Sequence, residues 1–339
     1  MSTNHNTKRI LIFLALSFGI PWAATLIISR SSMMITNPVQ AGSIANVLFI
    51  SIPWLANILT RLITREGWGN LWLKPNFKRG WKSYLALWLL PFLATVVGGL
   101  AFYLLFPQSF DPNLGVVRKV AESSPATAMI NPWSLLFSIT LSLMFVSALI
   151  NTVVSMGEEF GWRAYLLQKL MVGFSKPGLV GDDPMTASAE AQNSFAGFSP
   201  AAKRKAALLT GVIHGVWHLP LILLTASMTP GVSVFTPLVY LLFTCSLSIL
   251  LSWGTLNSGS VWPAALGHGV INAVSGLPGY LLLGLPIALI GPDPTGLIGG
   301  IGFTLLALIL IFRKGYAGRP ETIPGVNQAA IPDTNLVNR

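Results

Sequence analysis

The stretch "LLFSITLSLMFVSALINTVVSMGEEFGWRAY", residues 135–165, joins a long apolar run to a short cluster of charged residues. The run is long enough to cross a bilayer as a helix, because about 20 apolar residues suffice. Directly after it come Glu158, Glu159 and Arg163, in a chain where only 9% of the residues are charged. The fold prediction therefore starts from a membrane helix that carries ionisable groups at one end.

The composition extends this prediction to the whole chain. Hydrophobic residues make up 53% of the 339 residues, and the mean hydropathy is +0.66, so the chain holds more apolar surface than one soluble core buries. We predict an all-α, polytopic transmembrane helical bundle of about eight spans. The stretch 280–291 is too short to span alone and either extends the seventh helix or lies at the interface. The predicted spans are 10–29, 43–63, 84–106, 134–156, 206–227, 234–254, 260–278 and 296–312.

The distribution of charge predicts the orientation of these spans. The net charge is +10, but Lys and Arg cluster between alternate spans rather than along one basic face, which argues against a nucleic-acid partner. With the N-terminus inside, the exterior connections hold only Arg30, Arg118 and Lys119. The excess of Lys and Arg in the other connections predicts that both termini are cytoplasmic in a multi-pass protein of the plasma (inner) membrane.

Four regions are predicted along the chain. Residues 1–133 form N-terminal transmembrane helices, and residues 134–278 form a core that carries the polar motifs and a flexible cytoplasmic loop near 171–205. Residues 279–314 form a C-terminal transmembrane segment, and residues 315–339 form a disordered cytoplasmic tail rich in Pro, Gly, Ala and Asn. The single cysteine, Cys245, lies in an apolar run and is interpreted as a small packing residue.

Three histidines, His214, His218 and His268, lie inside the predicted spans, and Asn272 follows His268 in the same span. His214 and His218 are four residues apart, as are His268 and Asn272, so each pair projects from one face of its helix. Polar groups of this kind in a transmembrane helix are costly and usually face the bundle interior and each other. We therefore expect a shared interior site between helices, in the cytoplasmic half of the membrane.

The acidic motif separates the roles of its two carboxylates. Glu159 and Arg163 have the i, i+4 spacing that favours an ion pair, whereas Glu158 is rotated by about 100° and has no cation at that spacing. Glu158 is thus the carboxylate left to act as a general base toward water. Because the helix through this motif is too long to be straight, we also expect a break or tilt near Gly157.

The three polar motifs resemble those of one family. "EEFGWR" (158–163) is similar to the EExxxR motif, "HGVWH" (214–218) to FxxxH and "HGVIN" (268–272) to HxxxN of the CPBP intramembrane proteases. That family of CAAX proteases and bacteriocin-processing proteins, also called Abi, includes the type II CAAX prenyl endopeptidases. The resemblance implies that Glu158 activates water, that Glu159 and Arg163 organise the motif, and that His218, His268 and Asn272 complete the catalytic site.

One departure from the family pattern bears on a metal. His214 stands where the motif usually has an aromatic residue, and we interpret it as an accessory residue together with Trp217, which lines or packs the site. His214, His218, His268 and Glu158 make a chemically suitable zinc set. Activation of water by Glu158 without a metal fits the same residues, and the sequence leaves both open.

These residues lead to one main hypothesis for the function and two alternatives. The first hypothesis is an intramembrane endopeptidase that acts on a membrane-associated protein or peptide within the lipid bilayer, such as a CAAX-like or leader-peptide substrate. The second is a proton-coupled transporter that uses the same groups as a proton relay, although we find none of the inverted repeats that transport predicts. The third is a non-catalytic family member that acts as a bacteriocin-immunity protein or scaffold.

Overall fold

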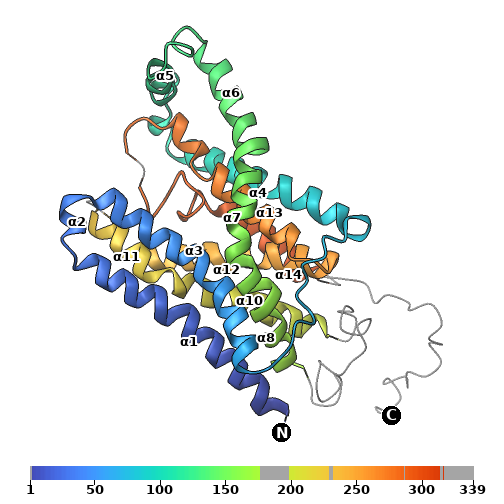
Figure 1. Cartoon of the computed structure of the whole chain (residues 1–339). Helices are drawn as coiled ribbons and strands as arrows, with labels where there is room; N and C mark the ends of the chain where they lie inside the picture. The colour runs from blue at the N-terminus through green and yellow to red at the C-terminus, as the bar shows by residue number, and fades with distance from the viewer. Residues whose placement is uncertain (1, 176–197, 229–231, 286, 314–315, 317–339) are drawn as a thin grey trace.

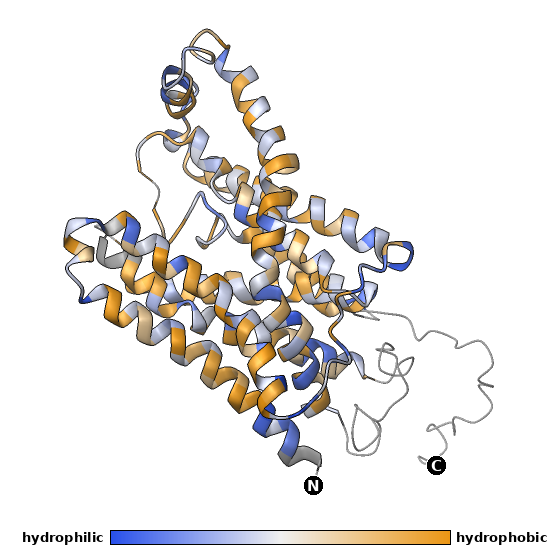
Figure 2. Ribbon diagram, in the orientation of Figure 1, coloured by the Kyte–Doolittle hydropathy of each residue, from blue (hydrophilic) through white to orange (hydrophobic). Residues whose placement is uncertain are grey.

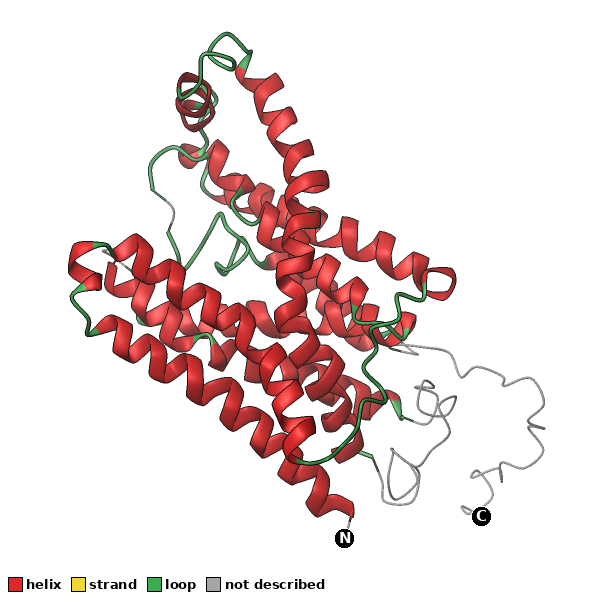
Figure 3. Cartoon of the chain, viewed as in Figure 1, coloured by secondary structure: helices red, strands yellow, loops and turns green. Residues whose placement is uncertain are grey.

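The computed structural model describes residues 2–175, 198–228, 232–285, 287–313 and 316, and their regular secondary structure is helical. Figure 3 shows helices joined by turns and loops, which confirms the predicted all-α fold. Helices form along the apolar runs because a helix satisfies its backbone hydrogen bonds internally, as lipid requires. In chain order the helices are α1 (Ser2–Ser29), α2 (Met33–Thr36), α3 (Pro38–Ile63), α4 (Phe77–Leu105), α5 (Gly115–Glu122), α6 (Pro132–Ser142), α7 (Ala148–Gly161), α8 (Leu167–Gly173), α10 (Pro200–Trp217), α11 (Leu219–Met228), α12 (Thr236–Ser258), α13 (Trp262–Val274) and α14 (Ile301–Phe312).

Six helical stretches of the described residues are long and apolar enough to cross a membrane, so the predicted count of about eight spans is not confirmed. The last two predicted spans, 260–278 and 296–312, form only α13 and α14, of 13 and 12 residues. Helices of that length rise about 18–20 Å, short of a hydrocarbon core of about 30 Å. Proline and glycine are frequent between them, in residues 276–300, and both residues end helices. The six candidate spans are His5–Ser29, Val39–Ile63, Phe77–Leu105, Pro132–Gly173, Pro200–Leu224 and Thr236–Ser258.

The surface of these helices has the character of a membrane protein. Figure 2 shows hydrophobic residues along most of α1, with hydrophilic residues collected at its N-terminal end. Large apolar side chains such as Leu104, Val153 and Phe312 are 71–81% exposed, which is costly in water and favourable in lipid. Together with the six apolar helices, this surface identifies a multi-pass membrane protein.

The acidic motif lies on one continuous helix of 42 residues, Pro132–Gly173, which comprises α6, α7 and α8 and runs through the centre of the molecule (Figure 1). The predicted break near Gly157 is wrong, because α7 passes through Gly157 as regular α-helix. The irregularities are instead two π turns, Leu143–Ser147 and Trp162–Leu166. The second π turn follows the acidic pair directly, and such turns often occur at functional sites.

Glycines allow neighbouring helices to approach the acidic helix closely. A Cβ atom at Gly161 would lie 2.6 Å from the Cβ of Pro53 on α3, so α3 and α7 are in direct contact there. Gly269 of α13 lies just as closely against the backbone of Thr152 on α7. Small residues have this use in membrane bundles, where van der Waals packing holds the helices together. The two contacts bring α3 and α13 against the segment that carries the acidic motif.

Another buried carboxylate holds the C-terminal part of the long helix in place. Glu66, in the connection after α3, accepts a hydrogen bond from the Tyr165 hydroxyl at 3.0 Å and forms an ion pair with Lys169. The Nε of Arg9, on α1, lies 3.5 Å from the same carboxylate. Arg61 of α3 lies over the Tyr165 ring, with its Cζ 5.3 Å from the ring centroid. These contacts hold the π turn and α8 against α1 and α3.

Most of the predicted loop and tail lies outside the described residues. For the loop near 171–205, α8 continues to Gly173 and α10 begins at Pro200, so both ends of the predicted loop are helical. Of the predicted tail, 315–339, the structure describes only Tyr316, whose buried hydroxyl donates to the carbonyl of Ile249 on α12 at 2.8 Å.

Candidate active site

Three helical segments bring the polar motifs to one place. Glu158 and Glu159 lie on α7, His214 lies near the end of α10 with His218 just after it, and His268 lies on α13. Five of the predicted site residues, Glu158, His214, His218, His268 and Asn272, line one cavity of about 400 Å³. The sequence motifs are therefore joined by the packing of helices that are distant in the chain.

Glu159 is the centre of a fully buried charge cluster. Its Oε1 lies 2.9 Å from a terminal guanidinium nitrogen of Arg163, which confirms the predicted i, i+4 ion pair. The same oxygen accepts a hydrogen bond from Nδ1 of His268 at 2.7 Å. Neither Glu159 nor Arg163 has any exposed surface. Separating the two partners of such a pair would leave a buried charge uncompensated, which is costly. The pair therefore holds the side chains of Glu159 and Arg163 in one arrangement.

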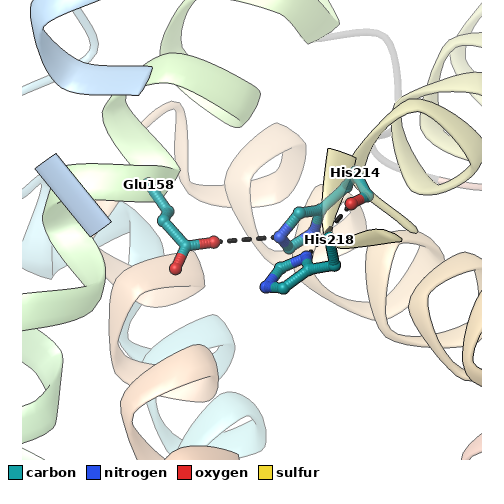
Figure 4. A group of neighbouring side chains, drawn as sticks. All are labelled: Glu158, His214 and His218. Carbon is teal, nitrogen blue, oxygen red and sulfur yellow. Dashed lines mark hydrogen bonds and ion pairs between the residues drawn. The ribbon is translucent and has the colours of Figure 1, made fainter. Parts of the chain in front are cut away.

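Glu158 contacts a histidine from another helix. Its Oε2 lies 2.9 Å from Nε2 of His214, and Figure 4 shows the two side chains facing each other from separate helices. The spacing within the motif gave Glu158 no partner, and this partner comes from α10. Because an ionised carboxylate only accepts hydrogen bonds, Nε2 of His214 carries the proton in this contact. The contact holds one oxygen of Glu158.

His218 is oriented by the backbone at the end of α10. Its Nδ1 lies 3.1 Å from the carbonyl oxygen of His214 (Figure 4). A carbonyl only accepts, so Nδ1 donates and Nε2 of His218 remains available as an acceptor or a metal ligand. The two imidazole rings have centroids 4.8 Å apart.

His268 and Asn272 form the wall contributed by α13. With Nδ1 of His268 bonded to Glu159, its Nε2 is the nitrogen free to serve the cavity that the residue lines. The Asn272 amide donates one hydrogen bond to the Ser155 hydroxyl at 3.2 Å, and an amide nitrogen carries a second hydrogen. Both residues can therefore present an N–H group to a bound molecule once His268 is doubly protonated.

Aromatic residues support the histidines from behind. Trp217 is completely buried and packs on the His218 ring at 4.6 Å between centroids, and its indole N–H donates to the carbonyl of Ser17 on α1 at 2.7 Å. Trp162 packs against both Trp217 and His214, at 5.2 and 5.4 Å. Trp217 is not among the residues that line the cavity, so it packs behind the site and does not line it.

The cavity has further polar lining that the sequence analysis did not single out. Tyr240 of α12 has its ring centroid 5.4 Å from that of His218. Asn46 of α3 and Asn151 of α7 line the same cavity. An amide side chain inside an apolar span is itself a signal, by the argument applied to the histidines, and it would have identified both asparagines.

Part of the polar set could hold a metal ion. One ligand atom each of Glu158, His214 and His218 lie within 4.8 Å of one another, whereas His268 is outside this group. Two imidazoles and a carboxylate match catalytic zinc sites, which keep a further position open. The Nδ1 contact of His218 with a carbonyl is also the outer-shell arrangement that metal-binding histidines use. The residues therefore fit zinc in kind and number.

Comparison with known proteins identifies the region that holds all of these motifs. Residues 134–274 match the family model described as "Type II CAAX prenyl endopeptidase Rce1-like". The matched stretch is somewhat less than half of the chain and includes α6, α7, α8, α10, α11, α12 and α13. No curated protein is similar enough to this chain to count as a match.

Proposed function

We propose that this chain, which belongs to the Rce1-like family of CAAX-type intramembrane proteases, is an endopeptidase that hydrolyses peptide bonds with water activated by Glu158. One observation carries the proposal. Glu158, His214, His218, His268 and Asn272 come from three helical segments and line one cavity within an apolar bundle. Ionisable groups in such a bundle are costly, so their convergence favours a functional site over a structural one.

Glu158 serves as the general base. Its Oε2 is held by His214 at 2.9 Å, which leaves Oε1 to accept a proton from a water molecule in the cavity. The water oxygen attacks the carbonyl carbon of the scissile peptide bond as its proton passes to Glu158. The protonated Glu158 then returns that proton to the amine that leaves when the C–N bond breaks.

His268 and Asn272 stabilise the negative oxygen that forms on the attacked carbonyl. Nδ1 of His268 is bonded to Glu159, so a second proton on its Nε2 gives an imidazolium that the carboxylate stabilises. The Asn272 amide, oriented by Ser155, supplies a second N–H. Preorganised donors of this kind act on the charge that develops in the transition state. Arg163 and Glu159 are positioning residues, since they hold His268 without touching the substrate.

Glu158, His214 and His218 are the residues that would hold a zinc ion. Zinc bound there supplies Lewis-acid polarisation of the carbonyl oxygen or of the water, and Glu158 is then a ligand instead of the base. The route with Glu158 as the base is the one proposed here, because it keeps the hydrogen bond between Glu158 and His214.

The substrate class follows from the site's surroundings. The cavity lies in a bundle with a lipid-exposed apolar surface, so the substrate is a membrane-associated protein or peptide that reaches the site within the bilayer. The family name points to peptides with a prenylated CAAX C-terminus, and a leader or signal peptide is the other form of membrane-bound peptide that we include. The plasma membrane is the proposed location.

The proposal is tested by comparing the membrane peptides of cells that carry the wild-type protein, Glu158→Gln or Glu122→Gln. Glu122 is exposed at the end of α5, remote in sequence from the motifs, so its variant is a matched control. We expect uncleaved precursors to accumulate with Glu158→Gln only, and their cleaved forms to appear with the wild type and with Glu122→Gln. Identical peptide profiles in all three strains would count against a peptidase.

A further inference from the structure

The cavity extends well beyond the acidic motif. Asn151 lies seven residues before Glu158 on α7, and Ser275 lies seven residues after His268, just past the end of α13. Seven residues are two helical turns, or about 10 Å. The two segments run antiparallel here, because His268 is bonded to Glu159 and Asn272 to Ser155. Asn151 and Ser275 therefore mark the same end of the cavity, two turns from the proposed catalytic groups.

A third helix contributes to this same end. Asn46 lies one turn before Ile50 on α3, and the Ile50 carbonyl is within 2.5 Å of a Cβ placed at Gly157 on α7. Farther along, Pro53 lies against Gly161, so α3 and α7 run in the same direction. Asn46 is thus level with the part of α7 that precedes the acidic motif. We call Asn46, Asn151 and Ser275, which all line the cavity, the amide end of the cavity.

The chemistry of the amide end differs from that of the catalytic end. The ionisable residues that line the cavity are Glu158, Tyr240 and the three histidines, and the amide end holds only neutral amides and hydroxyls. The Asn151 amide donates to the Ser147 carbonyl at 2.9 Å, which leaves its oxygen as an acceptor. Within the described residues, the Asn46 side chain makes no hydrogen bond. A neutral ligand that both donates and accepts hydrogen bonds fits this end better than an ion does.

Apolar residues occupy the wall between the two ends. Ile50 of α3, Val154 of α7 and Ile271 of α13 line the cavity there. A ligand that lies along this wall must therefore combine apolar groups with a neutral chain of donors and acceptors. An extended peptide with apolar side chains has this composition, since each residue carries one N–H and one C=O.

We propose that Asn46 and Asn151 form a second subsite, which binds the main chain of the substrate a few residues away from the bond that is cut. This inference rests on the proposed peptidase function and adds where the substrate is held. The amides provide the hydrogen bonds that the substrate main chain loses on leaving water, and unpaired main-chain groups in an apolar site are costly. Because the subsite is remote from the reacting bond, it contributes binding in the ground state and the transition state alike.

The test uses Asn46→Leu, Asn151→Leu, the double variant, and Asn257→Leu as a matched control. Asn257 is half-buried on α12, and its amide donates to the Trp253 carbonyl four residues earlier at 2.7 Å, as Asn151 does to Ser147. It is not among the residues that line the cavity. The probe is an internally quenched peptide that covers a cleavage site found in the comparison of membrane peptides.

We expect KM for this peptide to rise about fivefold in each single variant and at least tenfold in the double variant, as the loss of one or two neutral hydrogen bonds implies. The value of kcat should stay within about twofold of the wild-type value. The reason is that the subsite binds the ground state and the transition state equally, so its loss raises KM alone. In a Glu158→Gln background, the Kd of the same peptide should weaken by the same factors. Thermal melting in detergent and the Asn257→Leu control should remain at wild-type values.

Three results would overturn the subsite: wild-type KM in both single variants, a fall in kcat at unchanged KM, or an equal effect of Asn257→Leu. Failure of the proposed function looks different. In that case Glu158→Gln cuts the peptide at the wild-type rate, whatever the asparagine variants do.

Discussion

At the scale of single residues, the two adjacent glutamates differ in what holds them. Glu159 has a cation and an imidazole on one oxygen, and it is completely buried. Glu158 lines the cavity, and its side-chain partner within the described residues is His214. The difference arises because consecutive residues on a helix point about 100° apart, so one faces the bundle and the other faces the cavity. In the proposed mechanism, Glu159 therefore has a positioning role and Glu158 a chemical one.

The positioning role predicts a loss of stability for Glu159→Gln. The substitution removes the charge that compensates buried Arg163, which typically costs about 3–5 kcal/mol. We expect a clearly lower melting temperature in detergent together with a loss of cleavage. A Glu159→Gln protein that melts like the wild type would show that Arg163 does not depend on this carboxylate.

The role of His214 is decided by a metal test. Without a metal, His214 only orients Glu158, so we expect His214→Phe to retain part of its cleavage activity and a chelator such as phenanthroline to leave the wild-type rate within about twofold. Elemental analysis of protein purified without chelators provides the independent measurement. Zinc near one per chain, lost from both His214→Phe and His218→Phe along with cleavage, would instead make Glu158 a ligand.

At the scale of the elements, the site depends on how closely α3 and α13 approach α7. Glycines produce this approach, and a single methyl group tests it. In Gly161→Ala the new Cβ meets Pro53 at 2.6 Å, whereas a Cβ at Gly19 on α1 meets nothing within 4 Å. We expect Gly161→Ala to cost about 1–3 kcal/mol of stability by overpacking and to reduce cleavage, because Glu159 lies half a turn away.

The control for this prediction is Gly19→Ala. Alanine is favoured over glycine in a helix by about 1 kcal/mol, so the control should melt at or slightly above the wild-type temperature. Equal melting of Gly161→Ala and Gly19→Ala would mean that α3 moves away from α7 without cost.

Much of the helical architecture was predictable, since apolar runs of sufficient length form helices in lipid regardless of tertiary detail. The contact of His268 with the acidic motif was predictable for a different reason, because polar groups inside a membrane bundle usually face one another. The Rce1-like family model matches the region that holds the three short motifs. The π turn at Trp162–Leu166 and the partner of Glu158 were not predictable, since both depend on contacts between helices. The shortness of α13 and α14 was also missed, because a hydropathy window counts apolar residues across the Pro and Gly residues that end these helices.

At the scale of the whole molecule, the orientation in the membrane remains a prediction from the positive-inside rule. Reporter fusions at residue 190 and at the C-terminus should read as cytoplasmic, and a fusion at residue 115 should read as external. The reason is the excess of Lys and Arg in the connections assigned to the inside. An external reading at residue 190 would invert the bundle and place the approach to the site from the other side of the membrane.

The central claim is that Glu158 activates the water that hydrolyses a membrane-associated peptide. It is tested most directly by purified wild-type and Glu158→Gln proteins cutting the same quenched peptide in detergent. Glutamine keeps the shape of the side chain but cannot take the proton, so we expect normal melting and a cleavage rate at least ~100-fold lower. A Glu158→Gln protein that melts normally and still cuts at the wild-type rate would contradict the account.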